Sequence, residues 1–246
     1  MPEKTSYLPG EPIWTDLSTP DVTASAAFYG ELLGWEATEG DPQFGGYGSF
    51  LLDGRVVAGV MPLMSPEQPV TWTAYICSED AAATAALVQE AGGSTVAPPM
   101  QVADLGTMAV FADPQGAVFG VWQPGSHVGA ELTGQDGTQA WLELTAEDPA
   151  APPAFYGRVF GWDAKVSEAY VELTLTGRSV AGVTDPSQGT SGWLPYFQVS
   201  DPGASTEQAK GLGATVVLPL TTFDGGSCTI VRDPHGAVFG LLHTDD

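Results

Sequence analysis

The chain has 246 residues, with 30 Asp and Glu against 7 Lys and Arg, so its formal net charge is −23. Hydrophobic residues make up 43% and charged residues 15%, a balance that supports a packed core and excludes a disordered chain. A chain this acidic has neither the basic surface of a nucleic-acid-binding protein nor the polybasic patch of a membrane-bound one. We therefore expect neither nucleic acid nor membrane as a partner.

Targeting and cysteine signals are weak. The start at Met1 lacks the basic and then apolar run of a signal peptide, and no apolar run is long enough to span a bilayer. Cys77 and Cys228 lack the close spacing of a disulfide framework or a zinc knuckle. We expect a reduced, cytoplasmic protein.

Hydrophobic periodicity predicts that strands and helices alternate along the first half. A strand at residues 13–19 precedes a helix that starts near Asp21 and stops at Gly34, a residue suited to a left-handed cap. A hairpin follows around the Asp53-Gly54 dipeptide. The remaining predicted elements are strands at 70–77, 95–97, 107–111 and 118–123 and a helix at 80–91.

The second half repeats these patterns. Ala27-Phe-Tyr-Gly30 recurs as Ala154-Phe-Tyr-Gly157, and Gly54-Arg-Val-Val-Ala-Gly-Val60 recurs as Gly177-Arg-Ser-Val-Ala-Gly-Val183. Asp113-Pro-Gln-Gly-Ala-Val-Phe-Gly120 recurs as Asp233-Pro-His-Gly-Ala-Val-Phe-Gly240. Three matches in the same order indicate a duplication. We expect domains at 8–125 and 135–246, a turn-rich linker at 126–134, and second-half helices near 150–160 and 203–212.

These repeated phrases resemble the vicinal oxygen chelate superfamily, which includes glyoxalase I, bleomycin-resistance proteins and extradiol dioxygenases. The similarity covers nearly the whole chain and points to the two-domain, actinobacterial "hydroxylase" or "glyoxalase-like" type. It implies an α+β fold of two tandem glyoxalase-like domains, each of two βαβββ modules forming a curved sheet around a cup. Function varies widely within such a fold, so the fold alone does not define it.

Enzymes of this superfamily typically hold one divalent metal in each cup with His and Glu side chains. Carried over onto this chain, the first-cup ligand positions fall on Trp14, Trp72 and Gly120, and the second-cup positions on Trp141, Trp193 and Gly240. An alignment shift of one residue replaces the middle positions by Thr73 and Leu194. Indole offers only a donor and glycine has no side chain, so we expect no metal and no other cofactor.

Strand alternation predicts what each cup contains instead. Trp14 and Asp16 share one face of their strand, and Trp141 and Glu143 share one face of the matching strand. Gly120 and Trp122 are expected to face the first cup and Gly240 the second. The cups are then either aromatic-walled ligand sites or sites plugged by tryptophan.

Three functions remain open. The first is a metal-free protein that binds a small aromatic or amphipathic molecule through Trp14, Trp72, Gly120, Trp122, Trp141, Trp193 and Gly240, in resistance or secondary metabolism. The second is a tailoring enzyme, such as a lyase, oxygenase or cyclase, that uses Asp16 or Glu143 as acid or base or has a displaced metal site. The third is a scaffold with plugged cups. Because one chain supplies four modules, either a monomer or a homodimer is expected.

Overall fold

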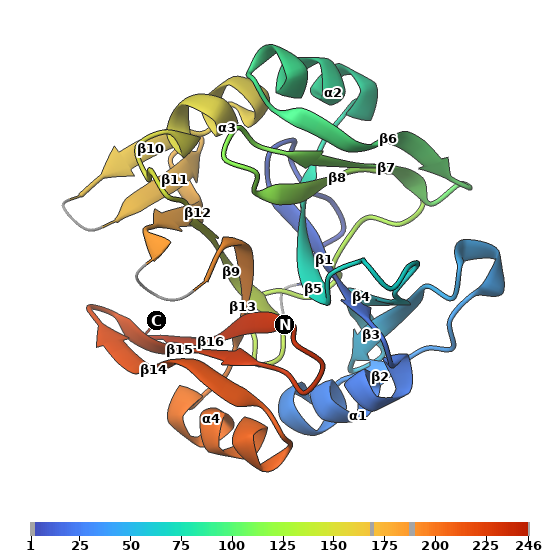
Figure 1. Ribbon diagram of the computed structural model, residues 1–246, viewed down its shortest axis with the longest axis vertical. Coiled ribbons are helices and arrows are strands. Elements are labelled where there is room, and N and C mark those ends of the chain that lie inside the picture. Colours follow the sequence, from blue (N-terminus) through green and yellow to red (C-terminus); the bar gives the residue numbers. More distant parts are fainter. Residues whose placement is uncertain (1–2, 168–169, 187–189, 246) are drawn as a thin grey trace.

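The computed structural model describes residues 3–167, 170–186 and 190–245, and it arranges them around two eight-stranded sheets (Figure 1). The first half contains helices α1 (Val22–Leu33) and α2 (Ala81–Glu90), a short 3-10 helix (Pro42–Phe44), and strands β1 (Pro12–Thr19), β2 (Glu36–Ala37), β3 (Gly48–Leu52), β4 (Arg55–Pro62), β5 (Thr71–Cys77), β6 (Ser94–Val102), β7 (Gly106–Ala112) and β8 (Val118–Pro124). The second half contains α3 (Pro152–Phe160), α4 (Pro202–Gly211), β9 (Gln139–Thr145), β10 (Asp163–Val166), β11 (Val171–Leu175), β12 (Arg178–Thr184), β13 (Gly192–Gln198), β14 (Thr215–Phe223), β15 (Gly226–Arg232) and β16 (Val238–Thr244).

Both sheets have the same topology. The strand order is β2-β3-β4-β1-β5-β8-β7-β6 in the first sheet and β10-β11-β12-β9-β13-β16-β15-β14 in the second. The two βαβββ modules of each half meet at an antiparallel pair, β1 with β5 and β9 with β13. The α+β architecture of two tandem domains that the sequence predicted is therefore the observed one.

The helix ends follow the expected local chemistry. Asp21, Asp80 and Asp201 each accept a hydrogen bond from a backbone N–H in the first turn of the helix that follows. Helix α3 has no side-chain cap and starts instead at Pro152, whose missing N–H costs little in a first turn. Gly34 has φ 76°, as the predicted left-handed cap requires. None of the helices in the described ranges is long and apolar enough to cross a membrane.

One strand is longer than predicted. The strand expected at 95–97 extends over Ser94–Val102, through Pro98 and Pro99. Proline is tolerated here because β6 is an edge strand, and its pairing with β7 shifts register between Thr95 and Ala97 and between Ala97 and Met100. The same edge position in the second sheet holds β14, which contains Pro219.

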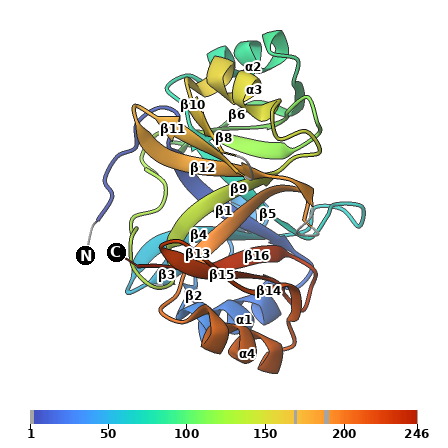
Figure 2. The same ribbon diagram turned by 90° about the vertical axis from the view of Figure 1, so that its left-hand side faces the viewer.

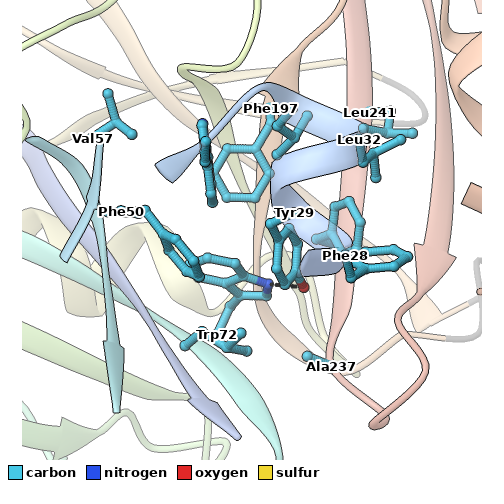
Figure 3. Close-up of a cluster of buried hydrophobic side chains, with 14 of the residues drawn as sticks. Phe28, Tyr29, Leu32, Phe50, Val57, Trp72, Phe197, Ala237 and Leu241 are labelled. Atoms are coloured by element: carbon cyan, nitrogen blue, oxygen red, sulfur yellow. Dashed lines mark hydrogen bonds between the residues drawn. The ribbon is translucent and has the colours of Figure 1, made fainter. Parts of the chain in front are cut away.

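The two halves share their hydrophobic cores. Helix α1 packs beside α4 at one end of the molecule, and α2 packs beside α3 at the other (Figure 2). One core joins Phe28, Tyr29 and Trp72 of the first half to Phe197 and Leu241 of the second (Figure 3). The matching core joins α2 and α3. The helices therefore lie between the sheets, and the opposite face of each sheet forms a cup.

Candidate functional site

Strand register defines which side chains face each cup. In the first sheet, Trp14 pairs with Tyr75 and Asp16 with Thr73, so these four share one face. Tyr75 in turn pairs with Gly120, and Cys77 with Trp122. We call this group the first cup: Trp14, Asp16, Thr73, Tyr75, Gly120 and Trp122. The second cup has the same register and consists of Trp141, Glu143, Leu194, Tyr196, Gly240 and Leu242.

The expectation that Trp72 and Trp193 face the cups is wrong. Trp72 pairs with Leu17 and lies in the core between the halves, where its Nε1 donates to the Tyr29 hydroxyl at 3.0 Å. Trp193 lies in the matching core and donates to the Tyr156 hydroxyl at 2.8 Å. The alignment shift of one residue is therefore the correct one, and Thr73 and Leu194 take their places in the cups.

Each cup contains a hydrogen-bonded network built around one carboxylate. In the first cup, Trp14 Nε1 donates to the Tyr47 hydroxyl at 2.8 Å, and Tyr47 donates to Asp16 Oδ2 at 3.3 Å. Tyr75 and Thr73 lie on the same face beside Asp16 and favour its charged form. The sequence predicted Trp14 and Asp16 on one face of a strand, and the structure brings them together through Tyr47.

The second cup repeats this network. Trp141 Nε1 donates to the Tyr170 hydroxyl at 2.9 Å, and the Tyr196 hydroxyl donates to Glu143 Oε1 at 3.0 Å. The Tyr170 hydroxyl lies close enough to Glu143 to favour its charged form. Cys228 lies close enough that Glu143 helps to raise its pKa to about 11, mainly because the thiol is desolvated, so the thiol is neutral.

Burial perturbs both carboxylates. Desolvation raises the pKa of Asp16 to about 6, although hydrogen bonds from Tyr75, Tyr47 and Thr73 act in the opposite direction. Desolvation also raises the pKa of Glu143, opposed by hydrogen bonds from Tyr196 and Tyr170. Buried carboxylates with raised pKa values are candidates for proton transfer.

The tyrosines were missed in the sequence, although the internal repeat contains a signal for them. A β-carbon on Gly59 or Gly182 would overlap the hydroxyl of Tyr47 or Tyr170. These glycines occupy the same place in the two repeated hairpins, and each tyrosine recurs with its glycine. The repeated glycine therefore marks the place where a tyrosine side chain lies directly over the strand.

The residues at the implied metal positions do not fit a metal ion. A β-carbon on Gly120 would overlap the ring of Tyr75, and one on Gly240 would overlap the ring of Tyr196, so neither position has room for a Glu side chain. The remaining positions hold Trp14, Thr73, Trp141 and Leu194. Within the described residues, no group of three His, Cys, Asp or Glu side chains is placed to hold a metal.

The first cup is covered by chain from outside the sheet. Residues 125–132, which follow β8, cross its mouth: the His127 ring packs edge-on against Trp14 at 4.7 Å, and Trp122 Nε1 donates to the His127 carbonyl at 2.9 Å. The N-terminal segment adds Tyr7, whose hydroxyl donates to the Ala130 carbonyl at 2.7 Å. Trp14 is only 4% exposed as a result. We call residues 125–132 the strap.

The second cup is more accessible. Its residues Trp141, Tyr170 and Cys228 are half-buried, and Leu242 stands where the first cup has Trp122. Phe223, at the end of β14, lies on the same face as Cys228 according to the β14–β15 register, and it is 47% exposed. Glu143 is buried beneath these groups. The two cups therefore differ at their tryptophans: Trp14 is buried, whereas Trp141 is half-buried and more accessible.

A separate cavity of about 370 Å³ lies between the halves, and it includes Trp72, Trp193, Asp113 and Thr145 among its lining residues. A second, of about 280 Å³, lies between α1 and α4 and includes Leu33 and Gln208. Neither contains Trp14, Asp16, Trp141 or Glu143.

Comparison with known proteins agrees with this architecture. Residues 13–121 match the model of the Glyoxalase/Bleomycin resistance protein/Dioxygenase superfamily, and residues 141–242 match that of the Glyoxalase-like domain. The 2,3-dioxygenase LapB from Pseudomonas sp. KL28 has a similar structure, with a TM-score of 0.66 and 14% identity over 96% of this chain and 93% of that one. The Mn(II)-bound glyoxalase from Novosphingobium aromaticivorans gives a TM-score of 0.65 and 16% identity over 95% and 82%. At these identities the likeness concerns the fold alone.

Two curated relatives are similar over nearly their whole length. The anthracycline biosynthesis protein DauV of Streptomyces sp. (strain C5) is 38% identical over 97% of this chain and 94% of its own. The anthracycline biosynthesis protein DnrV of Streptomyces peucetius is 36% identical over the same shares. The chain belongs to the glyoxalase/bleomycin resistance/dioxygenase superfamily.

Proposed function

We propose that the second cup binds a small aromatic or amphipathic molecule without a metal ion, and that the protein acts in secondary metabolism. One observation carries this proposal: Trp141 is half-buried beside the network of the buried Glu143, whereas its counterpart Trp14 in the first cup is 4% exposed and packs against His127 of the strap. We assign no ligand to the first cup, where Trp14, Trp122 and His127 pack against one another.

The composition of the second cup supports a flat ligand with few polar groups. Leu194, Leu218 and Leu242 form apolar walls, and Glu143 with its two tyrosine hydroxyls supplies the polar floor. An apolar concavity with a few convergent polar groups is the usual character of a small-molecule site. The net charge of −23 disfavours an anionic ligand, so we expect a neutral or cationic one.

The relatives support the class of compound. DauV and DnrV are named for anthracycline biosynthesis, and anthracyclines are polycyclic aromatic compounds. Aromatic side chains such as Trp141, Tyr170 and Phe223 offer the flat surfaces on which such rings stack. This chemistry argues for a polycyclic aromatic ligand or a precursor of one.

Fluorescence titration tests the proposal. The planar ketones 9-fluorenone and 1-tetralone are expected to quench part of the tryptophan fluorescence of the full chain. Trp141→Phe is expected to abolish this quenching, because Trp141 forms the wall of the open cup. The matched control Trp14→Phe, in the covered cup, is expected to retain it. Absence of quenching by both ketones, or quenching that depends on Trp14 instead, would overturn the proposal.

A further inference from the structure

The polar floor of the second cup contains a buried carboxylate that the binding of an apolar ligand does not require. Glu143 is 7% exposed and accepts a hydrogen bond from the Tyr196 hydroxyl at 3.0 Å. The nearby Tyr170 hydroxyl favours its charged form and accepts a hydrogen bond from Trp141. An apolar ligand would be held as well by an apolar floor, and burying a carboxylate costs free energy. A buried carboxylate beside phenol donors at the bottom of an accessible cup is a typical arrangement for moving a proton.

We infer that the second cup catalyses reversible proton transfer at the carbon next to the carbonyl group of a bound ketone, through an enolate, with Glu143 as the base and the Tyr170 hydroxyl as the hydrogen-bond donor to the enolate oxygen. This inference rests on the proposed function, since the substrate must occupy the same cup. The substrate class is a flat ketone that carries a C–H bond next to its carbonyl group.

The proton and electron balance needs no further reactant. Glu143 takes the proton from the carbon next to the carbonyl, and the electron pair of that C–H bond forms a C=C bond while the carbonyl π pair moves to oxygen. The protonated Glu143 no longer needs two donors, so the Tyr170 hydroxyl is free to turn towards the enolate oxygen. Glu143 then returns the proton to carbon, at the original position or at a conjugated one. Nothing is oxidised or reduced.

The positions of the hydroxyls distinguish their roles. Tyr170 is half-buried and reaches the accessible part of the cup, whereas Tyr196 is 3% exposed and its ring covers Gly240. Tyr196 is therefore a positioning residue, which holds Glu143 Oε1 at 3.0 Å. Its hydrogen bond favours the carboxylate form, so its removal is expected to raise the pKa of Glu143 further.

Deuterium exchange measures the reaction directly. In D₂O, 1-tetralone is expected to lose the proton signal of its C2 position in the presence of the full chain, followed by proton NMR. General acid–base catalysis contributes about 100-fold to 10,000-fold, so Glu143→Gln is expected to lower the exchange rate at least about 100-fold. Glu143→Asp is expected to retain a measurable rate, and Tyr170→Phe to lower the rate about tenfold or more. Asp16→Asn, in the covered cup, leaves the rate unchanged.

The pH profile supplies the readout for Tyr196. The exchange rate is expected to rise with pH as Glu143 loses its proton, and Tyr196→Phe is expected to shift that rise to higher pH. The other titratable groups that face Glu143 are Tyr170 and Cys228, whose pKa values are raised by burial, so neither loses its proton in this range.

Two results separate this inference from the proposed function. Suppose that 1-tetralone quenches the fluorescence of Trp141 but that the wild-type chain exchanges its C2 protons no faster than the Glu143→Gln variant does. Binding then stands and the catalytic inference is overturned. If exchange persists in both Glu143→Gln and Tyr170→Phe, the inference is also overturned. Absence of quenching by both 1-tetralone and 9-fluorenone overturns the proposed function itself.

Discussion

At the scale of single residues, the two cup carboxylates have different surroundings despite equivalent positions. Asp16 is 3% exposed beside Tyr47, Tyr75 and Thr73, in the cup whose Trp14 packs against His127 of the strap. Glu143 lies below half-buried groups. The sequence offered both as candidate acids because it repeats a carboxylate two residues after a tryptophan. The neighbouring tryptophan distinguishes them, because Trp14 is buried and Trp141 is half-buried.

The perturbed Asp16 leads to a prediction about stability. Its pKa is about 6 in the folded chain and 3.8 in its ordinary state, so the folded chain binds the proton more tightly. The contribution to stability is fully present below pH 3.8 and is lost as the pH rises through about 6. A difference of about two units corresponds to about 3 kcal/mol at neutral pH.

Asp16→Asn is therefore expected to stabilise the chain at pH 7 by up to about 3 kcal/mol, because the amide imitates the protonated acid. Urea unfolding at pH 4, 5.5 and 7 measures this, and the gain over the wild type should shrink towards pH 4. A gain that is constant with pH, or a loss at pH 7, would contradict the assignment.

At the scale of elements, the strap explains why the cups differ. It is anchored by backbone hydrogen bonds from His127 to Leu105, from Ala130 to Ile13 and from Glu131 to Val56. The strap is attached to the cup through Trp122 of β8. The equivalent residue of β16 in the second cup is Leu242. The sequence predicted a turn-rich linker, but turn-rich composition does not reveal that the segment packs over a cup.

Trp122→Leu is expected to make the first cup resemble the second. The substitution removes the hydrogen bond to the His127 carbonyl and the ring contact with His127, at a cost of about 2–3 kcal/mol. Acrylamide should then quench the fluorescence of Trp14 more strongly. The contribution of Trp14 is obtained as the difference in quenching between the Trp122→Leu variant and the Trp122→Leu/Trp14→Phe double variant. Leu242→Ala is the control and should leave Trp14 quenching unchanged.

Strand faces show where prediction from the sequence ends. The bounds of strands β1 and β5 were predicted to within one residue. The position of Trp14 and Asp16 on the same face of β1 was also predicted. The face of Trp72 was not, because both faces of β5 are buried: Trp72 and Ala74 on one side, and Tyr75 and Cys77 on the other. Without polar alternation, only pairing with β1 defines the register.

At the scale of the whole molecule, two repeated motifs meet across the halves. Tyr29, from the first Ala-Phe-Tyr-Gly motif, donates to Asp233 Oδ2 at 3.0 Å, and Tyr156, from the second, donates to Asp113 Oδ2 at 3.1 Å. The other oxygen of each Asp accepts backbone N–H groups of its own turn. Each half therefore completes a buried hydrogen-bond chain of the other, which comparison of motifs within one half does not reveal.

These reciprocal bridges predict that the halves unfold together. Tyr29→Phe leaves Asp233 Oδ2 and the Trp72 indole without their shared partner, which should cost about 2 kcal/mol, and Tyr156→Phe should have the same effect through Asp113 and Trp193. Because both bridges lie in cores shared by the two halves, each variant should shift a single unfolding transition. Tryptophan fluorescence and circular dichroism in urea measure whether the transitions coincide. A variant that splits unfolding into two steps, one of them at the wild-type midpoint, would show that the halves are independent.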